Sequence, residues 1–267
     1  MNTIEIKGLH FSYTEKEEIL KGLDLTIDQR STAIIGQNGA GKTTFVKLLK
    51  GLLRPTRGSI LFNGRDLKDM TVAQLAGDIG LVFQNPNDQI FKNTVLDEVM
   101  FGPLQIGMSK EEARESALKA LSMVGLEGIG KMNPYDLGLS DRKMISIAAI
   151  VAMKTQVVIF DEPTIAQDYM GKERIKSIMR ELSSQGRIVI SILHDMDFVA
   201  ETFERVIVFA KGSILLDGDA RTVFAGREAL EQAYLEQPNT TRLCRQLGYE
   251  EIFLTPEEFI AFKNKEQ

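Results

Sequence analysis

The stretch Gly36-Gln37-Asn38-Gly39-Ala40-Gly41-Lys42-Thr43 decides the fold, since its spacing is the Gly-x-x-x-x-Gly-Lys-Ser/Thr pattern of a phosphate-binding loop. The apolar run 32–35 before it predicts a buried strand, and the apolar residues of 44–49 recur at helical spacing. Glycines let backbone N–H groups approach phosphate oxygens, and the positive end of a helix favours an anion. The stretch therefore predicts a strand, a phosphate-binding loop and a helix; the alternative is a chance glycine-rich turn.

Individual residues of this loop have separate expected roles. We expect the Lys42 ammonium to reach the β- and γ-phosphates of a nucleotide and the Thr43 hydroxyl to ligate Mg²⁺. The expected nucleotide contacts in and beside the loop are Gly36, Gln37, Asn38, Gly39, Ala40, Gly41, Lys42, Thr43 and Thr44.

A second apolar run, 157–160, ends in two carboxylates, Asp161 and Glu162. An uninterrupted apolar strand is typical of a parallel sheet, and ligand chemistry lies at the carboxyl edge of such a sheet. Asp161 is then the expected Mg²⁺ ligand, and Glu162 the residue that orients or deprotonates an attacking water. The alternative is that one of them caps a helix, although Pro163 breaks any helix that begins immediately.

Composition places the chain among ordinary globular proteins. With 267 residues, 43% of them hydrophobic, it is long enough for one large α/β domain, or for a domain of about 200 residues with a small appendage. The net charge of −5 argues against nucleic acid as a partner. No apolar run approaches the roughly 18 residues of a membrane span. The N-terminus lacks a secretory pattern, and the single cysteine suits a reducing compartment.

Hydrophobic periodicity predicts the elements that follow. Short apolar runs at 4–6 and 11–13 indicate strands, and Ser109 with Glu112 forms a capping-box pattern before a helix. The apolar stripe of that helix is Ala113, Ala117, Leu118, Leu121 and Val124, ended by Gly125. A second helix is expected at about 141–153, a helix over 170–182 between the strands 157–160 and 187–193, and a hairpin over 205–217 that turns at Lys211-Gly212.

With these motifs in place, the chain resembles the ATP-binding subunit of an ABC transporter over essentially its whole length. The resemblance implies an α/β fold, namely a P-loop NTPase core of the RecA-like type with an antiparallel β-subdomain and a helical subdomain at about 86–156. It implies an ABC ATP-binding domain at 1–218, a dimerisation appendage at 219–267, and ATP with Mg²⁺ as cofactors. The implied activity is ATP hydrolysis coupled to transport across a membrane.

Four further residues take roles from the resemblance. Gln84 matches the Q-loop glutamine, which contacts Mg²⁺ and the attacking water; alone it is an ordinary loop residue. Asp168 matches the D-loop aspartate, with a helix cap as the alternative. His194, at the end of a strand, matches the switch histidine that hydrogen-bonds the γ-phosphate. Tyr13 matches the aromatic ring that stacks on adenine, with core packing as the alternative.

Two segments are similar to the ATPases of energy-coupling factor and cobalt/nickel-type importers. Residues 84–91, Gln-Asn-Pro-Asn-Asp-Gln-Ile-Phe, resemble their Q-loop extension, which contacts a shared transmembrane coupling component. Residues 240–259 resemble the C-terminal segment that helps to hold two ATPases together. The resemblance implies a peripheral protein at the cytoplasmic face of the cell membrane that powers import of a vitamin or a metal ion.

The chain departs from the family at its signature. Members carry Leu-Ser-Gly-Gly-Gln about two dozen residues before the aspartate that matches Asp161, and here Leu137-Gly138-Leu139-Ser140-Asp141 begins 24 residues before it. Matching Leu139-Ser140 to Leu-Ser would shorten the next helix and turn its inner face by about 200°, so the unshifted register is kept. The serine hydroxyl is then lost at Gly138, Leu139 adds a branched side chain, and Asp141 adds a negative charge. The alternative is that Ser140 or Asp141 only caps the helix.

In the family the signature acts on the partner's nucleotide, so this departure predicts a heterodimer with a second ABC ATPase that carries the usual signature. At ~5 Å and an effective dielectric of ~20, the Asp141 charge repels each phosphate charge by about 3 kcal/mol, and the lost hydrogen bond is worth ~1.5–3 kcal/mol. Two other functions stay open: a regulatory ATP-binding subunit with weak hydrolysis, and a non-transport ABC ATPase that acts on ribosomes or DNA. The acidic balance and the single set of motifs argue against the last.

Overall fold

The centre of the molecule is a six-stranded sheet in the computed structural model, which describes residues 2–15 and 17–265. In spatial order its strands are β10 (Ser213–Asp219), β9 (Arg205–Ala210), β3 (Thr32–Ile35), β8 (Ile188–Ile192), β7 (Val157–Asp161) and β6 (Ile79–Val82). All except β10 run parallel to one another. The loops after β3, β6, β7 and β8 therefore leave from one edge of the sheet, and these loops carry the predicted catalytic residues.

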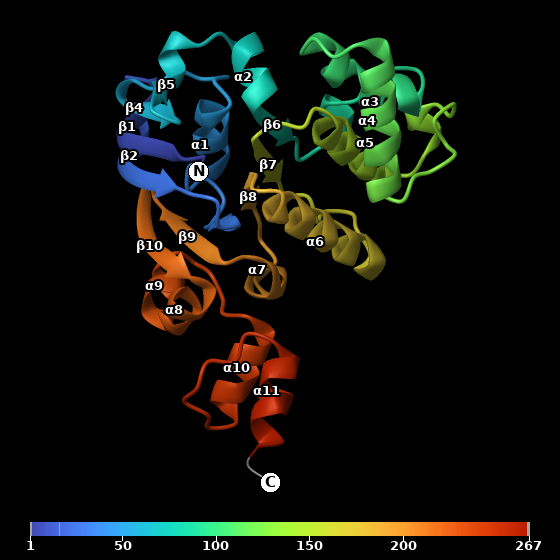
Figure 1. The fold of residues 1–267 in the computed structure, drawn as a ribbon. Helices are drawn as coiled ribbons and strands as arrows, with labels where there is room; N and C mark the ends of the chain where they lie inside the picture. The colour runs from blue at the N-terminus through green and yellow to red at the C-terminus, as the bar shows by residue number, and fades with distance from the viewer. Residues whose placement is uncertain (1, 16, 266–267) are drawn as a thin grey trace.

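A four-stranded antiparallel sheet forms the predicted β-subdomain. Its order is β2 (Glu17–Ile27), β1 (Ile4–Thr14), β4 (Arg57–Phe62) and β5 (Arg65–Asp66). The runs expected at 4–6 and 11–13 are two parts of the single strand β1, which pairs with β2 through register shifts. Helix α1 (Lys42–Leu49) lies between the two sheets, because its buried Phe45 joins one apolar cluster with Ile6 of β1 and Ile159 of β7 (Figure 1).

A helical lobe is inserted between β6 and β7 (Figure 1). It contains the 3-10 turns η2 (Pro86–Asp88) and η3 (Pro134–Asp136) and the helices α3 (Val95–Gln105), α4 (Lys110–Met123) and α5 (Leu139–Ala152); η1 (Leu67–Asp69) and α2 (Val72–Asp78) precede β6. The predicted capping box of Ser109 and Glu112 is present at α4. Leu118 was expected on the inner stripe, but it is 48% exposed because it lies one position, about 100° of helix, beyond the buried Ala117.

Two helices cover the other strands of the sheet. Helix α6 (Tyr169–Ser184) joins β7 to β8 and forms the predicted crossover, with Ile175 and Leu182 buried in one cluster with Phe160 of β7. Helix α7 (Met196–Thr202) then leads from β8 to β9. The predicted hairpin closes at Lys211-Gly212, where both residues have a positive φ, as the favoured two-residue hairpin turn requires.

The residues after 219 fall into two pairs of helices. In the first pair, α8 (Ala220–Ala225) and α9 (Arg227–Gln232), Phe224 and Leu230 are buried in the main apolar cluster. The second pair, α10 (Asn239–Gln246) and α11 (Pro256–Lys263), lies beyond α8 and α9 at the lower end of the molecule (Figure 1). The division at 219 stays a prediction, and the packing refines it by placing α8 and α9 with the core.

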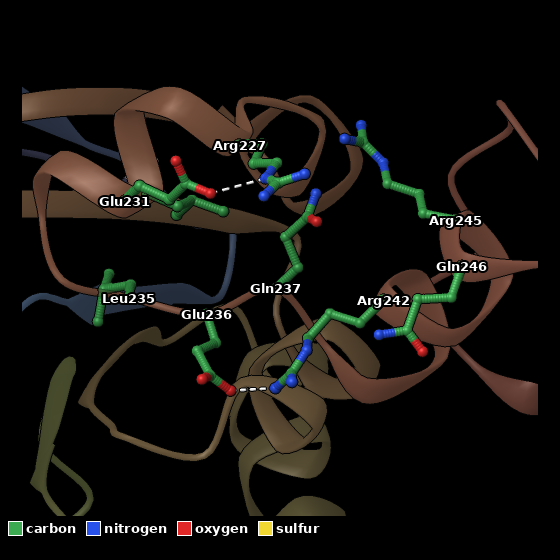
Figure 2. A pocket seen from close by; sticks show the side chains of 9 residues that line it. Arg227, Glu231, Leu235, Glu236, Gln237, Arg242, Arg245 and Gln246 are labelled. Carbon is green, nitrogen blue, oxygen red and sulfur yellow. Dashed lines mark hydrogen bonds and ion pairs between the residues drawn. The ribbon is translucent and has the colours of Figure 1, made fainter.

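A cavity of about 460 Å³ lies where the second pair joins the core (Figure 2). Ion pairs flank it on both sides, Arg227 with Glu231 on α9 and Arg242 of α10 with Glu236. The buried Gln237 donates its side-chain amide to the Phe224 carbonyl and so ties the connecting segment to α8. The connection between the two pairs of helices is therefore held by polar contacts.

Candidate active site

The phosphate-binding loop connects β3 to α1, and its glycines are required by its backbone. Gly36, Gly39 and Gly41 have φ of 152°, 79° and 102°, values that residues with a Cβ rarely adopt. A Cβ on Gly36 would lie 2.3 Å from the Phe209 carbonyl oxygen, and one on Gly41 would lie 2.7 Å from a Leu20 methyl group. The loop can therefore take this shape only with glycine at 36 and 41.

The first turn of α1 is open to an anion. Its N-cap residue is Gly41, and none of the described side chains caps it, so the N–H groups of the turn remain free to donate. Lys42 is buried beside them, and its Nζ donates to the carbonyls of Gly36 at 2.6 Å and Gln37 at 3.0 Å. Burial lowers the pKa of Lys42, and the charges of Glu162 and Asp161 oppose that shift. The loop thus encloses one lysine at the end of a helix that attracts phosphate.

Asp161 ends β7 as a buried carboxylate with an unused oxygen. Its Oδ1 has no hydrogen-bond partner within the described part of the chain. Burial raises the pKa of Asp161 to about 6, the Glu162 charge adds to the shift, and Lys143 and Lys42 oppose it. An unpaired buried carboxylate needs a counter-ion, and the exposed Thr43 in the first turn of α1 carries a hydroxyl oxygen.

These donors fit Mg²⁺ bound together with a nucleotide. Mg²⁺ is usually held by one or two carboxylates plus substrate phosphates and water, not by an all-protein cage. No group of three or more His, Cys, Asp or Glu that could hold a metal occurs among residues 2–15 and 17–265. The residues that would hold the ion are Asp161, Thr43 and Gln84.

The structure brings Glu162, Gln84 and His194 together, although they follow three different strands. Gln84 Nε2 donates to Glu162 Oε2 at 2.8 Å, and His194 Nε2 lies 3.0 Å from Glu162 Oε1. Glu162 itself has φ of 47°, an uncommon value for a side-chain-bearing residue and one that occurs at functional sites. The alternative that it caps a helix fails, since the next helix, α6, begins at Tyr169 and is capped by Asp168.

Tyr13 and Asp168 lie at the edges of this site. Tyr13 is 57% exposed and meets Phe11 edge to face at 4.8 Å, so the alternative of core packing is wrong and the ring is open to a ligand. Its hydroxyl lies 3.4 Å from the Thr44 hydroxyl of α1. Asp168 accepts the Gly171 N–H at 2.7 Å, so it does cap α6, and its role toward nucleotide stays a prediction.

The altered signature lies at the start of α5. Gly138 is the N-cap residue, so the alternative that Ser140 or Asp141 caps the helix is wrong. Leu139 and Ser140 are the first two helical residues, and Leu139 is exposed. The Ser140 hydroxyl donates to Gln167 Oε1 at 2.9 Å, and Gln167 Nε2 donates back to the Ser140 carbonyl at 3.4 Å. The remaining serine of the signature is therefore engaged within its own chain.

Sequence reasoning missed Gln167 and Lys143. Lys143 of α5 is 1% exposed, and its Nζ donates to the carbonyls of Phe83, at 3.1 Å, and of Gln84. Burial lowers the pKa of Lys143 to about 8, while Asp161 and Glu162 oppose the shift. The available signal was the pair Arg142-Lys143 followed by ten uncharged residues, 144–153, on a helix that the pattern already placed in the core.

A phosphate-binding loop, a strand-end carboxylate pair and a polar residue after each neighbouring strand define a nucleotide-hydrolysing enzyme of the P-loop class. Residues 20–165 match the family model described as ABC transporter. The chain is 38% identical over 249 residues to a putative ABC transporter ATP-binding protein of Pyrococcus furiosus, covering 93% of this chain and 95% of that protein. It is 36% identical over 251 residues to the energy-coupling factor transporter ATP-binding protein EcfA of Methanocaldococcus jannaschii, covering 93% and 90%.

A solved structure agrees with these relatives. CbiO1 of Clostridium perfringens, part of the ABC transporter complex cbiONQ, superposes with a TM-score of 0.78 at 30% identity and covers 92% of this chain and 98% of its own. The chain belongs to the ABC transporter ATP-binding proteins, among the ATPases of energy-coupling factor transporters. It is an ATPase, and the predicted fold class is confirmed.

Proposed function

We propose that this chain provides the phosphate-binding loop, Asp161 and Glu162 of the one competent ATP site in a heterodimer with a second ATPase. The observation that carries the proposal is a contrast within the chain. Glu162 is held between Gln84 and His194 beside an intact phosphate-binding loop. The signature, by contrast, has no side chain at Gly138 and has its serine bonded to Gln167. Catalytic residues without a competent signature are of use only opposite a different partner.

The chemistry follows from the positions of the side chains. Lys42 and the free N–H groups of α1 bind the phosphates of ATP, and bound Mg²⁺ supplies further positive charge there. Thr43, Asp161 and Gln84 would hold that ion. Glu162 orients the attacking water and accepts its proton, and the amide of Gln84 fixes one oxygen of that carboxylate. His194 then donates toward the γ-phosphate from the other side.

The proposed membrane partner is the transmembrane coupling component of an importer. The segment 84–91 ends at Phe91, which is 54% exposed and lies against Phe101 with Lys92 above both rings. This exposed aromatic edge beside the Q-loop glutamine supports docking of a membrane protein. In the described residues no helix has both the length and the apolar character needed to cross a bilayer. We place the chain at the cytoplasmic face of the membrane, with a vitamin or a metal ion as the imported substrate.

The proposed domain division gives the C-terminal helices the role of a dimer contact. Leu243 and Leu247 of α10 with its C-cap, and Ile260 of α11, are each more than half exposed. Three exposed leucine and isoleucine side chains on two short helices favour burial against another chain. We keep an ABC domain at 1–218, with its helical subdomain at about 86–156, and an appendage at 219–267. The exposed side chains support a dimer contact through the part of that appendage that α10 and α11 form.

The test uses the expected asymmetry between the two sites. Glu162→Gln keeps the shape of the site and removes the carboxylate, so we expect ATP binding to remain and turnover of the complex to fall by orders of magnitude. The matching glutamate change in the second ATPase should reduce turnover much less. Equal losses from the two changes, or full turnover and transport by a homodimer of this chain, would contradict the heterodimer. If Glu162→Gln leaves turnover unchanged, the competent site lies elsewhere.

A further inference from the structure

Lys143 is the buried cation of the site for which the proposed function gives no role. It lies in the second turn of α5, the helix that follows the signature, and its side chain is 1% exposed. Its Nζ donates to the carbonyls of Phe83 at 3.1 Å, of Gln84, and of Glu162 at 3.4 Å. An ammonium has three N–H donors, and here each has a backbone acceptor.

These acceptors belong to the two loops that carry the reacting side chains. Phe83 and Gln84 directly follow β6, and Glu162 directly follows β7. The side chains of Gln84 and Glu162 meet at 2.8 Å, while Lys143 binds the backbone of both residues from behind. One lysine on α5 thus sets the separation of the two strand ends from which that hydrogen bond is made.

Other contacts fasten the Q-loop to the same helix. Gln89 donates to the Ser146 carbonyl at 3.0 Å and accepts the Phe83 N–H at 3.1 Å, and Arg142 donates to Asn87 at 2.7 Å. All of them reach only the loop after β6. Ser140 reaches Gln167, farther along the loop after β7, and among the described side chains of α5 Lys143 is the one bonded to Glu162.

We propose that Lys143 is a positioning residue for ATP hydrolysis, which couples the placement of the signature helix α5 to the geometry of the Gln84–Glu162 pair. When α5 moves relative to the sheet, the lysine carries the backbone of both residues with it. Its acceptors are the carbonyls of Phe83, Gln84 and Glu162, outside the phosphate-binding loop, so its contribution lies in turnover and not in ATP affinity. The inference rests on the proposed function only in that Glu162 is taken as the water-orienting carboxylate.

The first test is Lys143→Met, which nearly preserves length and volume and removes the three donors. In the full chain, within the complex in which it turns over ATP, we expect kcat to fall at least tenfold and the Kd of a fluorescent ATP analogue to stay within threefold of wild type. The matched control is Lys176→Met, which removes another buried lysine, 7% exposed, on α6 that pairs with Glu173 and Glu201 outside the site. It should lower the melting temperature and leave kcat within twofold.

A double-mutant cycle with Gln84→Ala gives a readout that a purely structural role would not move. If Lys143 acts through the Gln84–Glu162 pair, Lys143→Met should lower kcat by less than threefold further in the Gln84→Ala background. The inference would be overturned if the kcat losses of the two single variants multiply in the double variant. It would also be overturned by a kcat within threefold of wild type in Lys143→Met, or by a loss of ATP affinity in that variant equal to its loss of kcat.

Two additions keep the result interpretable. If Lys143→Met does not fold, Lys143→Gln takes its place and supplies a shorter amide donor. We expect this variant to retain ATP binding, with a kcat between those of wild type and Gln84→Ala. A wild-type kcat in Lys143→Gln would overturn the inference. Glu162→Gln is measured in the same series. Unchanged turnover in Glu162→Gln would overturn the proposed site, whereas its loss together with wild-type turnover in Lys143→Met would overturn the role of Lys143 alone.

Discussion

The unpaired carboxylate of Asp161 leads to a prediction about the nucleotide-free protein. Burial raises its pKa from 3.8 to about 6, so the fold favours the protonated acid, and the ionised form destabilises the protein. A shift of about 2 pH units corresponds to roughly 3 kcal/mol at most. We therefore expect Asp161→Asn, a neutral isostere, to stabilise the nucleotide-free chain by about 1–3 kcal/mol at pH 7.5.

The sign of this effect sets its pH dependence. For an acid whose pKa is raised by folding, the cost of ionisation is absent below the unfolded value of 3.8, grows as the pH rises, and is complete above about 6. The difference in unfolding free energy between Asp161→Asn and wild type should therefore be largest at pH 7.5. It should shrink steadily as the pH is lowered toward 4.5.

Differential scanning calorimetry of the full chain at these two pH values measures the effect. For a chain of this size each kcal/mol shifts the melting temperature by about 2–4 °C. Asp69→Asn, which changes an exposed carboxylate on η1, is the matched control and should shift it little. Because Asp161 is a proposed Mg²⁺ ligand, adding Mg²⁺ and ATP should raise the melting temperature of the wild type more than that of Asp161→Asn. A variant that melts at or below the wild-type temperature at pH 7.5, or a gain that does not depend on pH, would refute the reasoning.

Two further predictions concern the phosphate-binding loop. Lys42→Ala should weaken ATP binding at least tenfold, because a charge-assisted hydrogen bond is worth about 1.5–3 kcal/mol; unchanged affinity in a fluorescent-nucleotide titration would remove Lys42 from the site. Gly36→Ala should destabilise the chain by about 2–4 kcal/mol in urea unfolding, since its Cβ would lie 2.3 Å from the Phe209 carbonyl oxygen. Gly39→Ala is the control, because its Cβ would meet no described atom within 4 Å. Backbone strain alone should lower its unfolding free energy by no more than about 1–2 kcal/mol. Equal losses of stability in the two variants would contradict the steric argument.

Lys42 and Glu162 could be predicted because each follows an apolar strand in the sequence, whereas Gln84 and His194 took their proposed roles from the resemblance to the ABC family. Once β3, β6, β7 and β8 are read as parallel strands, their carboxyl ends must lie at one edge, and Lys42, Gln84, Glu162 and His194 come together. Periodicity located α4, yet it placed Leu118 on the wrong face, because neighbouring positions on a helix differ by about 100° and the stripe was drawn too wide.

The contacts of α5 could not be predicted in the same way. Lys143 and Gln167 act through the register of α5 against two loops, and that register depends on where the helix begins. It begins at Leu139, two residues before the position that periodicity predicted, because Gly138 provides the N-cap without a side-chain hydrogen bond. A local sequence pattern carries no information about packing between segments that are distant in the chain.

The altered signature differs from the family pattern by more than the serine missing at Gly138, because its remaining serine is bonded within the chain. With glycine at the N-cap, the only hydroxyl left in the segment, that of Ser140, lies inside the first turn of α5 and donates to Gln167 at 2.9 Å. Gln167 precedes Asp168, the cap of α6, so the bond joins the starts of two helices within one chain. For Ser140 to reach a nucleotide on a partner, this bond would have to break, and Gln167 Oε1 would need another donor. The altered segment is therefore stabilised in a form that does not present its hydroxyl outward, which supports a division of labour between two different ATPases.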